Sequence, residues 1–454
     1  MVQRNAPSRW LNAFNQPVHD ALHCYGAAVH SRLEPRRPGP SRPGRPRSRR
    51  ERLRRQFHVS VAALVVVLLA GGVVIARGAL RGHEKAGAAG KKTGGRRETK
   101  GPAGSPLSPG WRGDGKSVTL AFGGDVHFEG PLAVRLADDP STALDGNIAK
   151  LFSGADLRMA NFESALLDGA CTDPQPKQYV FHAPRTAVTA FKAAGITLVT
   201  EANDHGEDCG RPGLAESLAI SKATHFPIIG IGADAAQAFA PYRATINGQR
   251  IAIIAATEVI DTNLVASWTA TATQPGLASA YQEGELVAAV QAARRTSDTV
   301  VVFLHWGTET QQCPNPIQEP LAKALVRAGA DIVVGTNAHV LLGAGYLGTA
   351  FVDYGLGNLA FYDTTPPETS SGALHITITG RHVDSYSWRP ALIENGLPIP
   401  QYGPAAAAAV SRWRGLRGCT DLSLRPAASQ ASVHAETTLF AGPYIHQLAS
   451  PAGG

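Results

Sequence analysis

Four short polar motifs in this chain of 454 residues carry side chains of the types that bind metal ions. They are Gly-Asp-Val-His at 124–127, Asn-Asp-His at 203–205, His-Trp-Gly at 305–307 and Asn-Ala-His at 337–339, and each follows an apolar run. Asp, His and Asn side chains delivered into one crevice can ligate one or two divalent ions and leave a position open for water. A hydrolytic metal centre requires such a donor set.

The candidate ligands come from these motifs and from Glu163, a carboxylate that follows another apolar run. Asp125 and His127 alternate along the chain, so both can face the same ion where the chain is extended. The loop after 196–200 crowds several carboxylates together, and these repel each other unless a cation neutralises them. We predict the metal ligands Asp125, His127, Glu163, Asn203, Asp204, His305, Asn337 and His339.

The elements that must position these residues are short, continuously apolar runs separated by amphipathic stretches. This pattern is typical of a layered α/β domain whose sheet is covered on both faces. Strands are expected at 118–122, 157–160, 196–200, 226–231, 251–256, 299–304, 332–335 and 349–352, and helices at 185–194, 212–223, 282–294 and 317–328. A β-hairpin is expected at 373–388 and a further helix at 405–416. Because ligands gather at the carboxyl ends of parallel strands, we expect the motifs to meet there.

Charge is distributed unevenly along the chain. Residues 31–100 carry 19 Lys and Arg against 4 Asp and Glu, whereas residues 101–454 carry 22 against 31, so the net charge of +7 comes from the leader. The arginine-rich stretch is interrupted by prolines and lacks aromatic residues for stacking, so nucleic acid is not a predicted partner.

An uncharged apolar run at 59–76 follows that stretch and predicts a transmembrane helix over 57–77. The preceding arginines place the N-terminus in the cytoplasm and the body of the chain outside the cell, on a single-pass anchor. A cleaved signal peptide is the alternative, although the leader is long for one. The expected organisation is a cytoplasmic Arg/Pro-rich segment (1–56), the helix (57–77), a flexible linker (78–116), the α/β domain (117–400) and a partly disordered extension (401–454).

The cysteines fit this arrangement. Cys24 would stay reduced on the cytosolic side, whereas four cysteines of the body would lie in an oxidising space and suit two disulfides. These four are Cys171, Cys209, Cys313 and Cys419, and the sequence does not choose among their three connectivities. Cys209 and Cys313 each follow a candidate ligand closely, so a bridge near the site is expected.

Six segments together resemble a known family. They are GGDVHF (123–128), NFESAL (161–166), TEANDHGEDCG (200–210), FLHWGTE (303–309), DIVVGTNAHV (331–340) and DYGLGNLAF (353–361). In this order and spacing they are similar to the capsule-synthesis CapA family, the poly-γ-glutamate synthesis accessory proteins of the calcineurin-like metallophosphatase group. The resemblance implies a four-layer α/β sandwich, a metal site at the strand ends, an N-terminal membrane anchor and a part in making or exporting an anionic γ-linked glutamate polymer.

The resemblance also assigns roles to individual residues. Asp125 and His127 match the family's Asp-x-His motif, and Glu163 takes the position of a carboxylate that bridges two ions. Asp204 stands where the family usually has the second Asn of Asn-Asn-His, and a carboxylate there would still ligate a cation. The motif at 337–339 stands where the family usually has His-Pro-His, which removes one imidazole. The resemblance therefore implies one or two divalent ions, with Mn, Mg, Fe and Zn not distinguished.

Three hypotheses for the function follow. The first is a membrane-anchored surface protein that acts in synthesis, export or anchoring of a poly-γ-glutamate capsule, with the cytoplasmic membrane, the anionic polymer and other capsule subunits as partners. The second is a metal-dependent hydrolase, phosphoesterase or amidase-like, in which His205 donates a proton to the leaving group. The third is a non-catalytic scaffold of an export complex. The chain contains no Gly-rich phosphate loop, so ATP-driven ligation is not expected.

Overall fold

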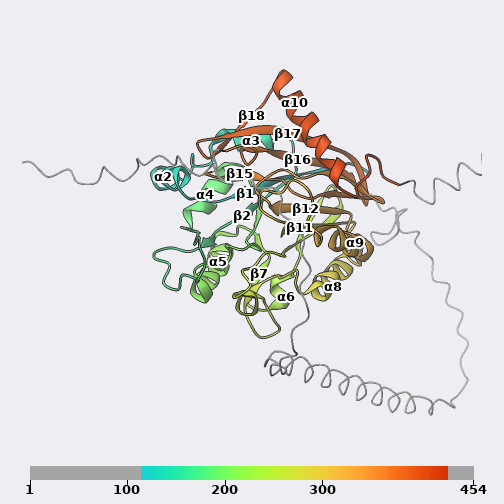
Figure 1. The fold of residues 1–454 in the computed structure, drawn as a ribbon. Coiled ribbons are helices and arrows are strands. Elements are labelled where there is room, and N and C mark those ends of the chain that lie inside the picture. The colour runs from blue at the N-terminus through green and yellow to red at the C-terminus, as the bar shows by residue number, and fades with distance from the viewer. Residues whose placement is uncertain (1–113, 363–364, 428–454) are drawn as a thin grey trace, which may run out of the picture. The chain divides into compact units, whose positions relative to one another are not determined.

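The computed structural model describes residues 114–362 and 365–427 of the chain (Figure 1). The predicted cytoplasmic segment, the predicted transmembrane helix at 57–77 and most of the predicted linker lie outside the described residues, as does 428–454. Within the described part, no helix combines the length and the apolar character needed to cross a membrane.

The first of two large sheets carries the beginning and the end of the described chain. Its strand order is β18-β17-β16-β1-β2-β5-β6, and β15 also pairs with β1. Strands β1, β2, β5 and β6 run parallel, so their carboxyl ends lie at one edge. The strands are β1 (Val118–Val126), β2 (Leu157–Phe162), β5 (Leu198–Thr200), β6 (Ile228–Ile229), β15 (Asn358–Ala360), β16 (Ser370–Thr379), β17 (His382–Glu394) and β18 (Leu397–Pro400).

The second sheet is built from the middle of the chain, in the order β13-β14-β12-β11-β9-β8. Its four inner strands β14, β12, β11 and β9 are parallel. The strands are β8 (Tyr242–Ile246), β9 (Gln249–Thr257), β11 (Thr299–Trp306), β12 (Ile332–Asn337), β13 (Ala344–Leu347) and β14 (Ala350–Asp353). Two short pairs lie outside the large sheets: β3 (Ala165–Leu166) with β4 (His182–Ala183), and β7 (Ile231–Gly232) with β10 (Gly276–Leu277).

Alternate residues of each strand point to opposite sides of its sheet, so each sheet has two faces. The two large sheets pack against each other through one face each. Leu120 and Phe122 of β1 share a buried cluster with Val301 and Phe303 of β11. The other face of the first sheet packs on one group of helices, and the other face of the second sheet packs on a second group. The packing order is therefore helices, sheet, sheet, helices, with the helices visible on both outer sides in Figure 1.

Helices α2 (Pro131–Asp138), α3 (Asp145–Leu151), α4 (Thr186–Ala193), α5 (Gly210–Thr224) and the short α7 (Val265–Trp268) bury apolar residues in the first group. Helices α6 (Ala235–Ala238), α8 (Glu283–Arg294) and α9 (Gln318–Ala328) do so in the second. Helix α10 (Gly403–Gly415) and the 3-10 turn η1 (Leu416–Cys419) follow β18. The indole of Trp413 in α10 is buried and stacks on Trp388 of β17, with ring centroids 5.5 Å apart.

The mixed α/β fold predicted from the sequence is confirmed, with some differences in detail. The strand expected at 226–231 is divided into β6 and β7, because Gly230 between them has a φ of 84°. Strands β1 and β11 extend to the metal-ligand motifs, so that Asp125 and His305 belong to the strands themselves.

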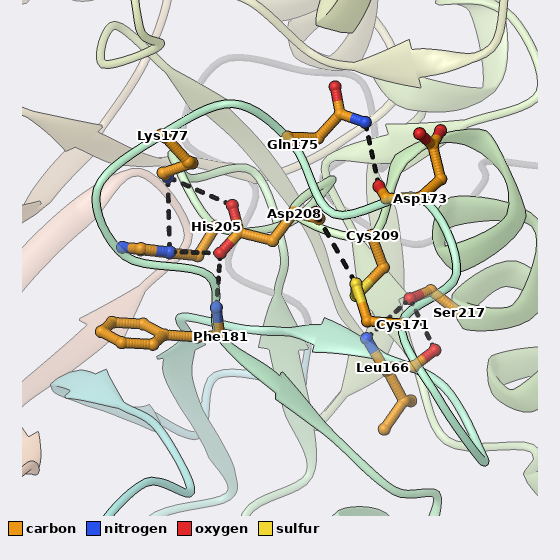
Figure 2. Close-up of a disulfide and its surroundings, with 10 residues drawn as sticks. All are labelled: Leu166, Cys171, Asp173, Gln175, Lys177, Phe181, His205, Asp208, Cys209 and Ser217. Atoms are coloured by element: carbon orange, nitrogen blue, oxygen red, sulfur yellow. Dashed lines mark hydrogen bonds and ion pairs between the residues drawn. A yellow bond between two sulfur atoms is a disulfide. The ribbon is translucent and has the colours of Figure 1, made fainter.

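Two disulfides join the four cysteines of the body. Cys171 pairs with Cys209, and Cys313 pairs with Cys419. The first bridge ties the 167–181 loop to the start of α5, next to His205 and Asp208 (Figure 2). The second ties the loop after β11 to η1, directly after α10.

Candidate metal centre

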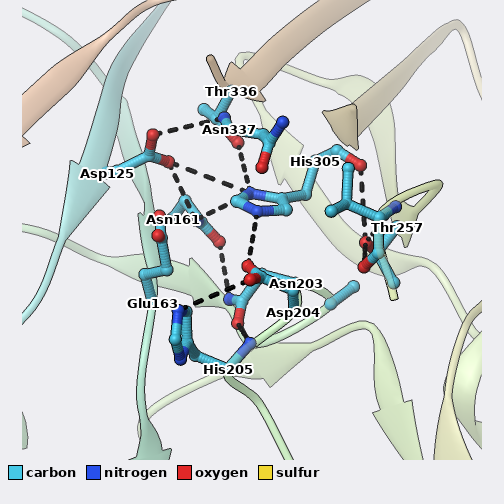
Figure 3. Close-up of polar contacts among 12 residues, drawn as sticks. Asp125, Asn161, Glu163, Asn203, Asp204, His205, Thr257, His305, Thr336 and Asn337 are labelled. Carbon is cyan, nitrogen blue, oxygen red and sulfur yellow. Dashed lines mark hydrogen bonds and ion pairs between the residues drawn. The ribbon is translucent and has the colours of Figure 1, made fainter. Parts of the chain in front are cut away.

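Three side chains from three strand ends meet at the edge between the sheets. Asp125 lies near the end of β1, Glu163 follows β2, and His305 lies near the end of β11. One ligand atom from each lies within 4.8 Å of the others, and all three side chains are buried. The group could therefore hold a metal ion, and Figure 3 shows the ring of His305 between Asp125 and Asp204.

A second group shares Glu163 with the first. Glu163, Asp204 and His205 also place ligand atoms within 4.8 Å of one another. Nε2 of His305 lies 3.0 Å from Oδ1 of Asp204, which connects the two groups. We call these five residues the strand-end cluster: Asp125, Glu163, Asp204, His205 and His305.

Asn161 in β2 holds the acids of the cluster in place. Its Nδ2 donates to Oδ1 of Asp125 at 2.9 Å and to Oε2 of Glu163 at 3.2 Å, while its Oδ1 accepts from Asn203 at 2.9 Å. Asn203 in turn accepts the backbone N–H of His205 on its Oδ1 at 3.0 Å. The side-chain amide of Asn161 thus bonds the carboxylates that would ligate an ion. Asn203 lies beside the cluster, and both ends of its side-chain amide already form hydrogen bonds.

The end of β12 brings Asn337 to the same edge, and the turn after it brings His339 there. Nδ1 of His339 lies 3.6 Å from Oδ2 of Asp125, and its Nε2 lies 3.6 Å from Oε1 of Glu163. Both residues have positive φ, 92° for Asn337 and 56° for His339. The backbone N–H of Asn337 donates to Asp125, but its side-chain Nδ2 donates to the carbonyl of Gly307. Asn337 thus meets the cluster through its backbone.

His127 lies near the cluster but belongs to neither group. Its ring stacks on Phe361 with centroids 3.7 Å apart, and its Nε2 accepts the backbone N–H of Tyr362. Burial, together with the nearby imidazoles of His339 and His205, holds the pKa of His127 well below its usual value. Its Nδ1 is buried without a hydrogen-bond partner among the described residues. Because Nε2 accepts a hydrogen bond, the neutral ring carries its proton on Nδ1, and this nitrogen would have to lose that proton to ligate an ion.

A buried lysine neutralises part of the acidic charge. Nζ of Lys177 lies 3.1 Å from Asp208, 3.6 Å from Asp204 and 3.7 Å from Asp261, and its side chain is only 5% exposed. Burial acts to lower the pKa of Lys177, but these three carboxylates outweigh it and raise that pKa. Asp208 also holds Nδ1 of His205 at 2.6 Å, as the dashed lines in Figure 2 show.

The charges of the cluster fit a cation. Burial and the negative charges of Asp125 and Asp204 raise the pKa of Glu163 well above its usual value. Burial would do the same to Asp204, but His205, Lys177 and His305 outweigh it and keep the pKa of Asp204 well below its usual value. Three carboxylates and two imidazoles at one buried edge form an oxygen- and nitrogen-rich donor set, which divalent ions prefer.

All nine site residues predicted from the sequence therefore lie at or beside the edge where strand ends of the two large sheets meet, and whether each ligates an ion stays a prediction. Sequence reasoning did not find Lys177, because a lone Lys in a loop gives no signal. Phe361 closes the segment 353–361 that resembles the family, but the sequence assigned no role to its ring. Asp208 and Asn161 adjoin predicted ligands in the sequence, so their nearness to the motifs was the usable signal.

Comparison with known proteins gives one family match. The family model described as "Bacterial capsule synthesis protein PGA_cap" matches residues 119–363, which include the whole strand-end cluster. The capsule biosynthesis protein CapA of Bacillus anthracis is 30% identical over 262 residues, covering 56% of this chain and 62% of that protein. The PGA biosynthesis protein CapA of Bacillus subtilis is 26% identical over 256 residues, covering 56% and 66%.

The chain thus spans less than two thirds of either relative's length. Among solved structures, a phosphatase from Mycoplasma pneumoniae is 15% identical and covers 64% of this chain and 97% of its own, at a TM-score of 0.38. That likeness is too low to carry a functional argument.

Proposed function

We propose a function from one premise: this chain belongs to the bacterial capsule synthesis protein family PGA_cap. The strand-end cluster holds one or two divalent metal ions and, through them, engages the carboxylates of a γ-linked glutamate polymer during capsule synthesis, export or anchoring. The names of the two Bacillus relatives, which refer to capsule and PGA biosynthesis, support the choice of polymer.

The observation that carries this proposal is the sharing of Glu163 by two ligand groups. Glu163 is 1% exposed and lies against the carboxylate Asp125, which is completely buried. Two buried carboxylates in contact lower the stability of the fold unless a cation neutralises them. Their presence here therefore supports a role in binding a cation. Asp125, Glu163 and His305 would hold one ion, and Glu163, Asp204 and His205 a second.

Divalent ions bound there would supply positive charge and an acidified water. The chain's own residues do the remaining work. Asn161 keeps Asp125 and Glu163 oriented, and Lys177 lowers the net charge of the Asp204 side of the cluster. An acidic polymer would be repelled by the bare carboxylates, so the ions are the attractive element at this edge.

Elemental analysis of the full-length protein, followed by polymer binding with and without excess chelator, tests the proposal. We expect one or two divalent ions per chain, and a loss of affinity for a γ-linked glutamate oligomer of at least about tenfold in chelator. A metal-free protein, or affinity that does not change in chelator, would contradict it.

A second candidate function is hydrolysis, favoured by the pairing of His205 with Asp208. Oδ2 of Asp208 accepts from Nδ1 of His205 at 2.6 Å, which leaves Nε2 as the ring nitrogen that could deliver a proton. His205 is 6% exposed, so the ring is buried within the site. This arrangement orients an imidazole as a general acid for a phosphoester or amide leaving group.

Replacing His205 by Ala tests this role in the metal-loaded protein. Turnover of a chromogenic phosphodiester should fall about 100-fold or more, the range of a lost general acid. Elemental analysis of the same variant separates the roles: retained metal indicates a proton donor, and lost metal indicates a ligand. Equal turnover would remove His205 from the mechanism, whereas no turnover in the metal-loaded unmodified protein would favour a non-catalytic scaffold.

We also propose that the body is held outside the cell by a helix over 57–77. The uncharged run at 59–76 after an arginine-rich stretch supports this topology. Protease added to intact cells should cleave the body while the N-terminal segment stays protected. Protection of both would contradict the proposed orientation.

A further inference from the structure

Two neighbouring cavities lie beside α10, and no residue of the strand-end cluster lines either of them. One has a volume of about 540 Å³ between α3, β17 and α10, and the other about 410 Å³ between β17, α10 and the segment 366–371. They share Trp388, Pro390 and Gln401. Because they meet at these residues, we treat them as one surface and call it the α10 groove.

The charged residues that line the α10 groove are all cations. Lys150, Arg389 and Arg414 line the larger cavity and Arg412 the smaller, and neither contains an Asp or a Glu. Within the described part of the chain, none of these four cations forms an ion pair with a carboxylate. Yet residues 101–454 carry more acids than bases. A groove of one charge in a domain of the opposite charge attracts an anionic ligand.

Two of the cations are oriented by neutral groups only. Lys150 donates to Oδ1 of Asn147 at 3.0 Å, and Arg389 donates to the carbonyls of Leu151 and Ser153 at 3.1 and 2.7 Å. Their positive charge is therefore positioned but not cancelled. A carboxylate that entered the groove could therefore pair with these cations without breaking an existing ion pair.

The rest of the groove suits a polymer with an aliphatic backbone. Trp388 is 5% exposed and forms part of the floor, with Pro390 beside it, whereas Tyr402 is 71% exposed at the mouth. Methylene groups of an extended chain can pack on such a floor while their carboxylates reach the cationic rim.

The groove also lies close to the cluster in the fold. Strand β17, which lines it, is separated from β1 by β16 alone, and β1 carries Asp125. The smaller cavity is lined by Leu341, two residues after His339. A long ligand in the groove would therefore lie on a part of the surface that continues toward the metal-ligand edge.

We propose that the α10 groove is an anion-binding site for a carboxylate-rich polymer, the same γ-linked glutamate chain that the strand-end cluster engages. The identity of the polymer rests on the proposed function, but the groove itself does not, since it holds the polymer without metal. Binding at two places raises the overall affinity, because the second contact becomes intramolecular.

The test measures binding of a γ-linked glutamate oligomer to the full-length protein in excess chelator, where only the groove contributes. The variant is Lys150→Glu with Arg414→Glu, two exposed bases from the last turns of α3 and α10. Its matched control is Lys222→Glu with Arg327→Glu, two exposed bases from the last turns of α5 and α9. Both pairs change net charge and helix-end charge equally.

We expect the groove variant to lose affinity at least about tenfold and the control less than about twofold, with a weaker salt dependence only in the groove variant. Equal losses in both pairs would overturn the proposal, as would tight binding of an oligophosphate with none of the glutamate oligomer. If the reversed pair does not fold, Lys150→Gln with Arg414→Gln gives the same answer with a smaller loss.

The same data separate this proposal from the proposed function. Binding of the groove variant in the presence of metal reports the cluster alone. If chelator leaves that residual binding unchanged, the metal proposal fails while the groove stands. If chelator removes all binding from the unmodified protein, the groove proposal fails while the metal proposal stands.

Discussion

The strand-end cluster and the α10 groove are opposite in charge, burial and construction. The cluster gathers buried carboxylates and imidazoles from the ends of parallel strands, and burial raises the pKa of its shared carboxylate, Glu163. The groove gathers cations around an apolar floor, mostly at the surface, where solvent reaches them. The first arrangement favours a small cation held by many ligands, and the second a large, flexible anion held by a few contacts.

Each region has its own covalent brace, which offers the strongest way to test their independence. Cys171–Cys209 closes a sequence separation of 38 residues beside the cluster, and Cys313–Cys419 closes 106 residues at the end of α10. A disulfide restricts the unfolded chain, and the effect grows with the length of the closed loop. Replacing both cysteines by Ser should therefore lower the free energy of unfolding by about 4 kcal/mol for Cys171–Cys209 and by about 5 kcal/mol for Cys313–Cys419. Urea unfolding measures both.

The functional losses should be separate. Without Cys171–Cys209 the loop that carries Lys177 loosens, so metal affinity should fall while polymer binding in chelator stays unchanged. Without Cys313–Cys419 the end of α10 loosens, so polymer binding in chelator should fall while metal affinity stays unchanged. If either double variant loses both functions equally, the two regions are parts of one site.

Replacing Glu163 by Gln sharpens the comparison at the cluster alone. Metal affinity should fall beyond the about 10–100-fold that is typical of lost outer partners, because both ligand groups lose a carboxylate. In chelator the variant should be more stable than the unmodified protein. The raised pKa of Glu163 means that the folded state loses stability as pH rises, and a neutral amide removes that loss.

Glu201→Gln is the control for that experiment. Glu201 is fully buried and burial raises its pKa to about 8, but it belongs to neither ligand group. Calorimetric metal titration should therefore show little change in this variant. A metal affinity of Glu163→Gln equal to that of Glu201→Gln would mean that Glu163 is not a ligand.

The two regions also differ in how far the sequence predicts them. Asp125 and His305 were predictable, because an apolar run that ends in a polar residue marks a strand end, and parallel strand ends meet at one edge. Helices α2 and α3 were not, because eight and seven residues are too few for a clear helical period. The groove depends on α3, β17 and α10, which are distant in sequence. No local pattern records that Lys150 and Arg414 line one cavity.

Under α10, a buried acid should make the groove side of the molecule sensitive to pH. Asp353 of β14 is completely buried, and burial raises its pKa to about 8, against the opposing effects of the Gly355 N–H and the Trp413 side chain. The folded state therefore keeps a proton that the unfolded chain releases near its ordinary pKa of 3.8. The free energy of unfolding should fall as pH rises between these two values, by about 1.4 kcal/mol per pH unit.

Asp353→Asn should remove this dependence of the free energy of unfolding on pH. Unfolding by urea at several pH values between 4 and 8 should give a shallower slope for the variant, with metal affinity unchanged, since Asp353 is in neither ligand group. Asp331→Asn gives the contrast. Burial raises the pKa of Asp331 too, against the opposing effects of Arg294 and Arg381, but replacing Asp331 also removes its ion pairs with these two arginines and should destabilise the fold. An unaltered slope in Asp353→Asn would show that Asp353 is ionised in the folded protein.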